Sequence, residues 1–130
     1  MRNNPRELLL NMHRQHVSGW QQKDMLTLRG VYAEQAVVFE KVPPPRFSDF
    51  KTFENTLHQY FSQVHDITLL TDNIQIEFSG DVGWITSQYL MAYHAKGRLQ
   101  RETGRWTEIY QRENGEWKRT HFHSSPDPFN

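Results

Sequence analysis

The segment that decides the fold is Arg105–Ser124, which reads RWTEIYQRENGEWKRTHFHS. Two runs rich in aromatic and β-branched residues flank the pair Asn114-Gly115, and this dipeptide is a strong signal for a β-hairpin. The sequence therefore predicts two paired antiparallel strands, over residues 103–112 and 117–124.

The length of the turn decides which side chains of this hairpin face the interior. A two-residue turn pairs Glu113 with Glu116 and sets Glu108 opposite His121, whereas a three-residue turn pairs Arg112 with Glu116. A shift of one residue exchanges the two faces of a strand. With the three-residue turn, the inner face carries Trp106, Glu108, Tyr110, Thr120, Phe122 and Ser124, and the outer face carries Arg105, His121 and His123.

Outside the hairpin, the spacing of apolar residues predicts three helices. One covers residues 5–20, with Leu9, Met12, His13, His16 and Trp20 on one stripe. Asp24 caps a second, short helix, and Ser48 or Asp49 caps a third. The third helix carries the apolar stripe Phe50, Phe53, Leu57, Tyr60, Phe61 and Val64.

The remaining strands complete the expected architecture. They are expected at 37–39, ending near Glu40, at 74–78 and at 83–94, and the prolines at 43–45 are expected in a loop. Helices first and a meander of strands afterwards predict an α+β fold with the helices on one face of an antiparallel sheet. The length is that of a single domain over residues 1–130.

Two stretches of the chain carry a resemblance to a known superfamily. The hairpin segment and the stretch Lys23–Phe39, where a short helix leads through Tyr32-Ala33 into a strand, resemble the nuclear transport factor 2-like superfamily. The likeness is greatest to its SnoaL-like and ketosteroid-isomerase-like branch and to the association (hub) domain of calcium/calmodulin-dependent protein kinase II.

The resemblance implies a cystatin-like cone, in which a strongly curved antiparallel sheet wraps around three N-terminal helices and encloses a pocket. It also implies a homodimer through the outer face of the sheet, and it favours the three-residue turn.

The same resemblance implies three catalytic candidates. Glu40, directly after the first strand, matches a general base, and His16 and Glu108 match two hydrogen-bond donors to a developing oxyanion. A carboxyl group donates only if burial keeps it protonated. His16 stands where that branch has tyrosine, and both acids are Glu rather than Asp. The expected chemistry is therefore cofactor-independent isomerase, cyclase or lyase (dehydratase) chemistry rather than steroid isomerisation itself.

The implied pocket would be aromatic and acidic. Its substrate-binding candidates are Trp20, Tyr89, Trp106, Tyr110, Phe122 and Ser124. Such a pocket suits a small, flat molecule that is neutral or cationic. The alternative is a non-catalytic homo-oligomerisation or assembly module like the kinase hub. A pocket filled by the protein's own side chains would favour that module.

Composition excludes several other classes of protein. Fifteen Lys and Arg balance fifteen Asp and Glu, so nothing predicts binding to nucleic acid or to a membrane surface. There is no cysteine, no apolar run of membrane-spanning length, no signal-peptide pattern at the N-terminus and no cofactor-binding motif, so a cytoplasmic protein without cofactors is expected. No metal site is expected, because the pairs His13/His16 and His121/His123 would lie on different faces.

Overall fold

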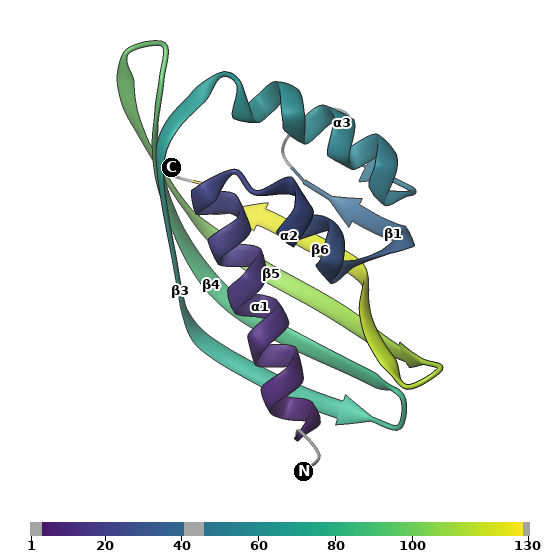
Figure 1. Cartoon of the computed structure of the whole chain (residues 1–130). Helices are drawn as coiled ribbons and strands as arrows, with labels where there is room; N and C mark the ends of the chain where they lie inside the picture. Colours follow the sequence, from purple (N-terminus) through teal and green to yellow (C-terminus); the bar gives the residue numbers. More distant parts are fainter. Residues whose placement is uncertain (1–3, 41–45, 129–130) are drawn as a thin grey trace.

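The protein is one curved sheet with helices on its concave side. The computed structural model describes residues 4–40 and 46–128, and the prolines at 43–45 lie outside them. The elements are α1 (Pro5–Gln22), α2 (Met25–Val31), β1 (Tyr32–Phe39), β2 (Arg46–Phe47), α3 (Phe50–Phe61), β3 (Val64–Ser79), β4 (Val82–Ala95), β5 (Arg98–Glu113) and β6 (Glu116–Pro126). The strand order is β2-β1-β6-β5-β4-β3. Figure 1 shows α1 lying across the concave side and the sheet curving around it.

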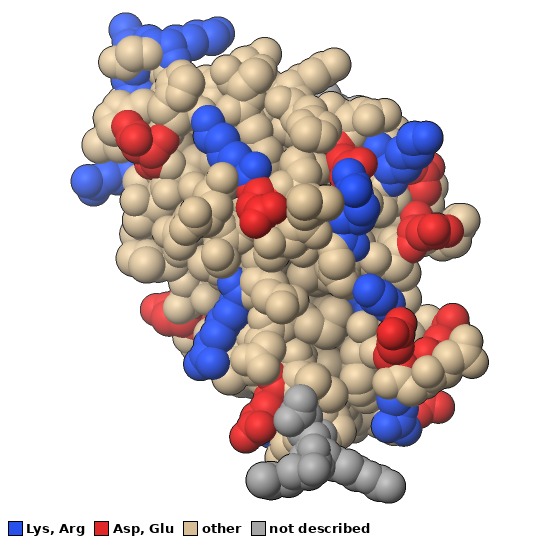
Figure 2. Space-filling view, viewed as in Figure 1, with Lys and Arg blue, Asp and Glu red and all other residues tan. Residues whose placement is uncertain are grey.

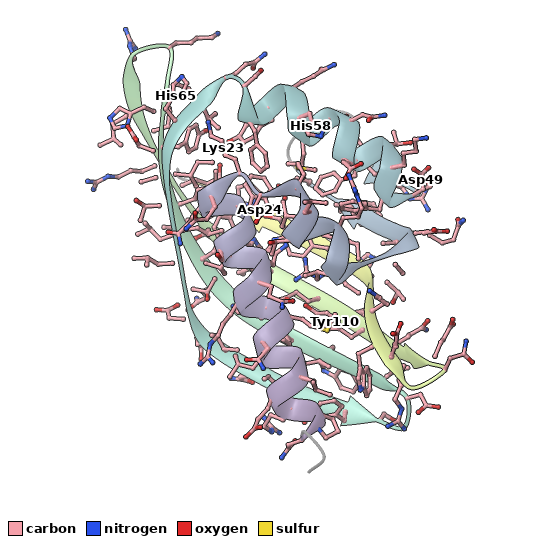
Figure 3. All side chains as sticks on the ribbon, in the orientation of Figure 1. Lys23, Asp24, Asp49, His58, His65 and Tyr110 are labelled. Atoms are coloured by element: carbon pink, nitrogen blue, oxygen red, sulfur yellow. The ribbon has the colours of Figure 1, made fainter. Side chains whose placement is uncertain are left out.

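Each helix begins at a side chain that accepts a backbone hydrogen bond. Asn4 caps α1, in front of Pro5, and accepts from the N–H of Arg6 at 2.8 Å. Asp24 caps α2 and Asp49 caps α3, as expected, by accepting from the N–H groups of Thr27 and Thr52. Figure 3 labels both aspartates at the helix starts. These hydrogen bonds lower the pKa of both carboxyl groups.

The tight turn of the β5–β6 hairpin has two residues, so the expected three-residue turn is wrong. Glu113 pairs with Glu116, and Asn114 and Gly115 both have positive φ, 52° and 80°, as a type I′ turn requires. The register then shifts at Thr120, because Tyr110 pairs with Arg119 but Ile109 already pairs with His121.

This shift restores the expected inner face for the far part of the hairpin. The extra residue at Thr120 is a β-bulge, and beyond it Glu108 lies opposite Phe122 and Trp106 opposite Ser124. Before the bulge, however, Arg119 is fully buried and Thr120 is only half-buried, so Thr120 is not the inner residue that was expected.

Other details of the sheet also differ from expectation. Val64 begins β3 instead of extending the third helix, and β1 pairs with β6 in parallel, so the sheet is not wholly antiparallel. Asp66 and Asn73 have positive φ where the β3 register shifts. These irregularities bend the edge strand and help it to follow the curvature.

Aromatic rings make up nearly half of the buried hydrophobic residues in the core between helices and sheet. The rings of Trp20, Phe50, Phe53 and Phe61 come from the helices, and those of Tyr32, Tyr89, Trp106, Tyr110 and Phe122 come from the strands. Among the described residues, no helix combines the length and the apolar character that a membrane crossing requires. Figure 2 shows acidic and basic side chains interspersed over the helix-bearing face.

A glycine on β5 makes room for this aromatic packing. A Cβ on Gly104 would lie 2.5 Å from the carbonyl oxygen of Ser125 and 2.6 Å from the ring of Tyr89. The backbone oxygen cannot move aside without disturbing the β5–β6 pairing.

We expect Gly104→Ala to lower the free energy of unfolding by roughly 1–3 kcal/mol, since overpacking costs that much. Urea denaturation measures the change. Gly30→Ala is the control: a Cβ there meets nothing within 4 Å, and alanine favours the helix by up to about 1 kcal/mol. Equal stability of Gly104→Ala and the wild type would contradict the packing argument.

Candidate functional site

A fully buried ion pair lies at the centre of the cone. The Nη2 of Arg119 on β6 donates to the Oε1 of Glu108 on β5 at 2.6 Å, and neither side chain is exposed. A buried charge is tolerated only where a partner and further hydrogen bonds compensate its lost hydration.

Two tyrosines complete the hydrogen bonding of the ion pair. The hydroxyl of Tyr110 donates to Glu108 at 2.7 Å and accepts from Arg119 at 2.9 Å, while that of Tyr32 accepts from Arg119 at 3.0 Å. Burial raises the pKa of Tyr110 well above its usual value, and that of Tyr32 to about 12. The guanidinium also lies over the Phe122 ring, 4.8 Å from its centre. Figure 3 marks Tyr110 on β5.

Helix α1 brings two histidines onto this pair. The Nδ1 of His13 lies 2.6 Å from the Oε2 of Glu108, and its Nε2 lies 2.8 Å from the hydroxyl of Thr71 on β3. One turn later, the Nδ1 of His16 lies 2.7 Å from Arg119 Nη1. Both imidazoles are 1% exposed. Six residues therefore form one buried network: His13, His16, Tyr32, Glu108, Tyr110 and Arg119.

The network sets the charge of its members. Burial alone would raise the pKa of Glu108, but the charge of Arg119 and the hydrogen bonds from His13 and Tyr110 outweigh it, and the pKa is lowered. Burial and the charge of Arg119 hold the pKa of His16 well below its usual value. Glu108 is therefore an ionised acceptor, and His16 is neutral. The oxyanion-donor role expected for Glu108 would need the protonated carboxyl that this environment disfavours.

A small cavity adjoins the network. It is lined by Trp20, Glu40, Leu69, Tyr89, Met91, Glu102, Trp106 and Ser124. About 20 Å³ is available to the centres of water molecules, which is room for about one of them. The Tyr89 ring stacks on Trp106, with centres 5.2 Å apart, and its hydroxyl donates to Glu102.

Trp106 connects the cavity to the network. Besides lining the cavity, its ring makes edge contacts with His13 at 5.9 Å, His16 at 5.1 Å and Phe122 at 5.3 Å. Trp106 is therefore in contact with both the cavity and the two histidines.

The structure brings the candidate residues together in two groups. Glu40, Trp20, Tyr89, Trp106 and Ser124 line the cavity. His16, Glu108, Tyr110 and Phe122 are buried around Arg119 and are not among the residues that line the cavity.

Sequence reasoning missed Arg119 and Glu102, and it considered His13 only as a core or metal-binding residue. The two-residue turn would have indicated Arg119, because it places Trp117 on the inner face of β6. Alternate residues of a strand share a face, so Arg119 then faces inward as well. No sequence pattern indicated Glu102, because it lies at the cavity through the hydrogen bond that it accepts from Tyr89.

No metal centre is visible in the part of the chain that the structure describes. There, no three His, Asp or Glu side chains are placed to hold an ion. The rings of His121 and His123 are 6.5 Å apart on the outer face, whereas His13 and His16 lie inside.

A wider groove lies elsewhere, between the α2–β1 junction, the start of α3 and the β5–β6 turn. It is lined mainly by charged and polar residues and, apart from Tyr32, by no member of the network. None of the candidate site residues lies there.

The low pKa of His16 predicts acid sensitivity. Below about pH 6.5 the unfolded chain binds a proton on His16, whereas the folded protein does not. The free energy of unfolding therefore falls toward acid pH. His16→Gln should reduce this slope, by at most about 1.4 kcal/mol per pH unit. Urea denaturation between about pH 5 and 7 measures it.

His58→Gln, on the exposed surface of α3 (Figure 3), is the matched control and should keep the wild-type slope. An unchanged slope in His16→Gln would mean that His16 is charged in the folded protein.

The comparisons with known proteins agree with this fold. Comparison with curated protein sequences gives no match. A hexachlorocyclohexane dehydrochlorinase, LinA-type3, from Novosphingobium barchaimii LL02 is 15% identical, with a TM-score of 0.85 over 96% of this chain and 88% of that one. A putative dehydratase of the NTF2-like family from Streptomyces avermitilis is 14% identical, with a TM-score of 0.83 over 93% and 95%.

A third similar structure is the CaMKII hub of S. rosetta, which is 13% identical, with a TM-score of 0.80 over 98% of this chain and all of that one. At such identities these likenesses show the fold alone.

The family model of the SnoaL-like domain matches residues 12–128. The described residues form a six-stranded curved sheet around three helices, which agrees with that match. The chain therefore belongs to the SnoaL-like, NTF2-like family.

Proposed function

We propose that this protein binds a small molecule beside Trp106 and catalyses proton transfer on it, with Glu40 as the general base. The observation that carries the proposal is the position of Glu40: its side chain is 9% exposed and lines the same cavity as Trp20, Tyr89 and Trp106. A carboxylate among aromatic rings is poorly hydrated, and this strengthens it as a base toward a bound substrate.

The chemistry of the lining defines the class of substrate. Glu40 and Glu102 give the cavity an acidic character, and the ion pair of Glu108 with Arg119 adds no net charge behind Trp106. A neutral or cationic ligand with a flat face is therefore favoured over an anion. Because the cavity holds about one water, such a ligand requires the lining side chains to move apart.

Elimination is the reaction class that the similar structures support. The names of two of them, a dehydrochlorinase and a putative dehydratase, denote loss of HCl and of water. In both reactions a base removes a proton from the carbon adjacent to the one that bears the leaving group, the electron pair of that C–H bond forms the C=C bond, and the leaving group departs as chloride or, with a proton, as water. Glu40 is the candidate base here, with Trp20, Tyr89, Trp106 and Ser124 as the binding surface and Tyr110 and Phe122 supporting it from behind.

The test begins with neutral cyclic halides and alcohols, hexachlorocyclohexane among them. A bound compound raises the melting temperature of the wild type, and chloride or water loss is then followed directly. We expect Glu40→Gln to keep binding but to lower turnover by about 10² to 10⁴-fold. Glu34→Gln is the control, because Glu34 is an exposed acid on β1, the strand that ends just before Glu40. Undiminished turnover in Glu40→Gln would reject Glu40 as the base.

The second candidate function is assembly without catalysis. Two observations favour it: the cavity is small, and hub domains share this fold. Both candidate functions include a homodimer that forms through the outer face of the sheet. The exposed Leu70 on β3 and Leu90 on β4 lie opposite each other on that face.

Leu90→Glu should therefore convert a dimer to a monomer, because it places a charge in the apolar centre of the proposed interface. Sedimentation equilibrium at micromolar concentration measures the mass. Leu26→Glu is the control, since Leu26 is 74% exposed but lies on α2, away from the sheet. A monomeric wild type would exclude this interface, and a dimer that binds none of the compounds would favour the assembly function.

A further inference from the structure

The hydrogen bonds of Arg119 determine where the proton of His16 lies. A guanidinium has donors but no acceptor, so the Nη1 of Arg119 must donate across the 2.7 Å to the Nδ1 of His16. That nitrogen therefore carries no hydrogen. Since His16 is neutral, its single hydrogen lies on Nε2.

Glu108 imposes the opposite arrangement on His13. An ionised carboxylate only accepts, so the Nδ1 of His13, 2.6 Å from Oε2, must carry a hydrogen. Its Nε2 is 2.8 Å from the hydroxyl of Thr71. Two histidines one helical turn apart thus turn the same nitrogen, Nδ1, toward the two halves of one ion pair, and this nitrogen carries a hydrogen in His13 but not in His16.

The remaining N–H of His16 has no partner. Among the described residues, its Nε2 is buried and unpaired, although the other polar atoms of this network are bonded. The indole N–H of Trp20 is also buried and unpaired. The His16 ring contacts Trp20 and Trp106, which both line the cavity. Buried donors without acceptors are rare in folded proteins, so these two N–H groups, whose rings are in contact, are candidate donors to an acceptor atom of a ligand.

We propose that Arg119 is a positioning residue that holds His16 in the Nε2–H form, so that His16 and Trp20 donate together to an uncharged oxygen acceptor of the ligand, such as a ketone. The ligand part rests on the proposed function, whereas the positions of the hydrogens do not. Because Arg119 is held by Glu108, Tyr110 and Tyr32, the donor stays fixed before any ligand arrives.

The tautomers are measured by two-bond ¹H–¹⁵N correlation spectra of the imidazoles in the unliganded wild type. His16 should show an unprotonated Nδ1 and a protonated Nε2 throughout about pH 5 to 8. His13, with its protonated Nδ1, is the internal reference. A protonated Nδ1 on His16, or its titration in this range, would overturn the proposal.

The role of Arg119 is tested by Arg119→Lys, because one ammonium group cannot reach Glu108 and His16 as the forked guanidinium does. In a folded Arg119→Lys variant His16 should show mixed tautomers, and an unchanged Nε2–H form would refute positioning. If the variant does not fold, the ¹⁵N–¹⁵N coupling across the Arg119–His16 hydrogen bond in the wild type decides: its presence supports positioning and its absence refutes it.

Cyclohexanone serves as the neutral carbonyl probe for the donor pair. It should shift the His16 Nε2–H and Trp20 Nε1–H resonances of the wild type, and His16→Phe should weaken its binding at least about tenfold. Unshifted resonances, or equal binding by His16→Phe, would refute the donor role. Glu40 acts as a base independently of this pair, so elimination that depends on Glu40 would still leave the proposed function standing.

Discussion

The ion pair between Glu108 and Arg119 is the interaction on which the interior of this protein depends. Removing two charges from water is costly, and apolar side chains of the same size often stabilise a core at least as well. Here the pair is retained with nearly full hydrogen bonding, and it joins β5 and β6 to α1 through two histidines and to β1 through Tyr32. Loss of one partner would leave the other charge buried and uncompensated.

Two environments of different charge meet at Trp106, which lines the cavity and contacts the two histidines of the network. In the network, the charges of Glu108 and Arg119 cancel, and both side chains are sealed from solvent. At the cavity, Glu40 and Glu102 contribute to the wall. Under the proposed function these two acids therefore govern the potential at the ligand, while the network supplies fixed dipoles.

The SnoaL-like fold by itself is compatible both with catalysis of elimination and with assembly. Proteins named for elimination reactions and proteins named for assembly share this curved sheet and its three helices at 13–15% identity. Chemistry in such a family is carried by the side chains placed in the cone rather than by the cone. In this chain those side chains include the acids at positions 40 and 102 and the buried His16 and Trp20.

The sequence by itself determined the three helices and the order of the main strands, but not the short strand β2 or the first part of β3, because caps, turn residues and apolar spacing are local signals. Asp24, Asp49 and Asn114-Gly115 could be interpreted without any knowledge of the tertiary structure. The inner face of β5 was also predicted correctly. Phe122 and Ser124 of β6 face inward as expected, although the turn is shorter, because the bulge at Thr120 compensates for it.

Only the tertiary structure decided which polar side chains meet. The two-residue turn sets Arg119 opposite Tyr110 on the inner face of the sheet, where its side chain reaches Glu108. The charge of Glu108 then follows from Arg119 and His13, residues that are 11 and 95 positions away in the chain. A local pattern carries no information about contacts of that kind, so the reversal of Glu108 from donor to acceptor could not be predicted from the sequence.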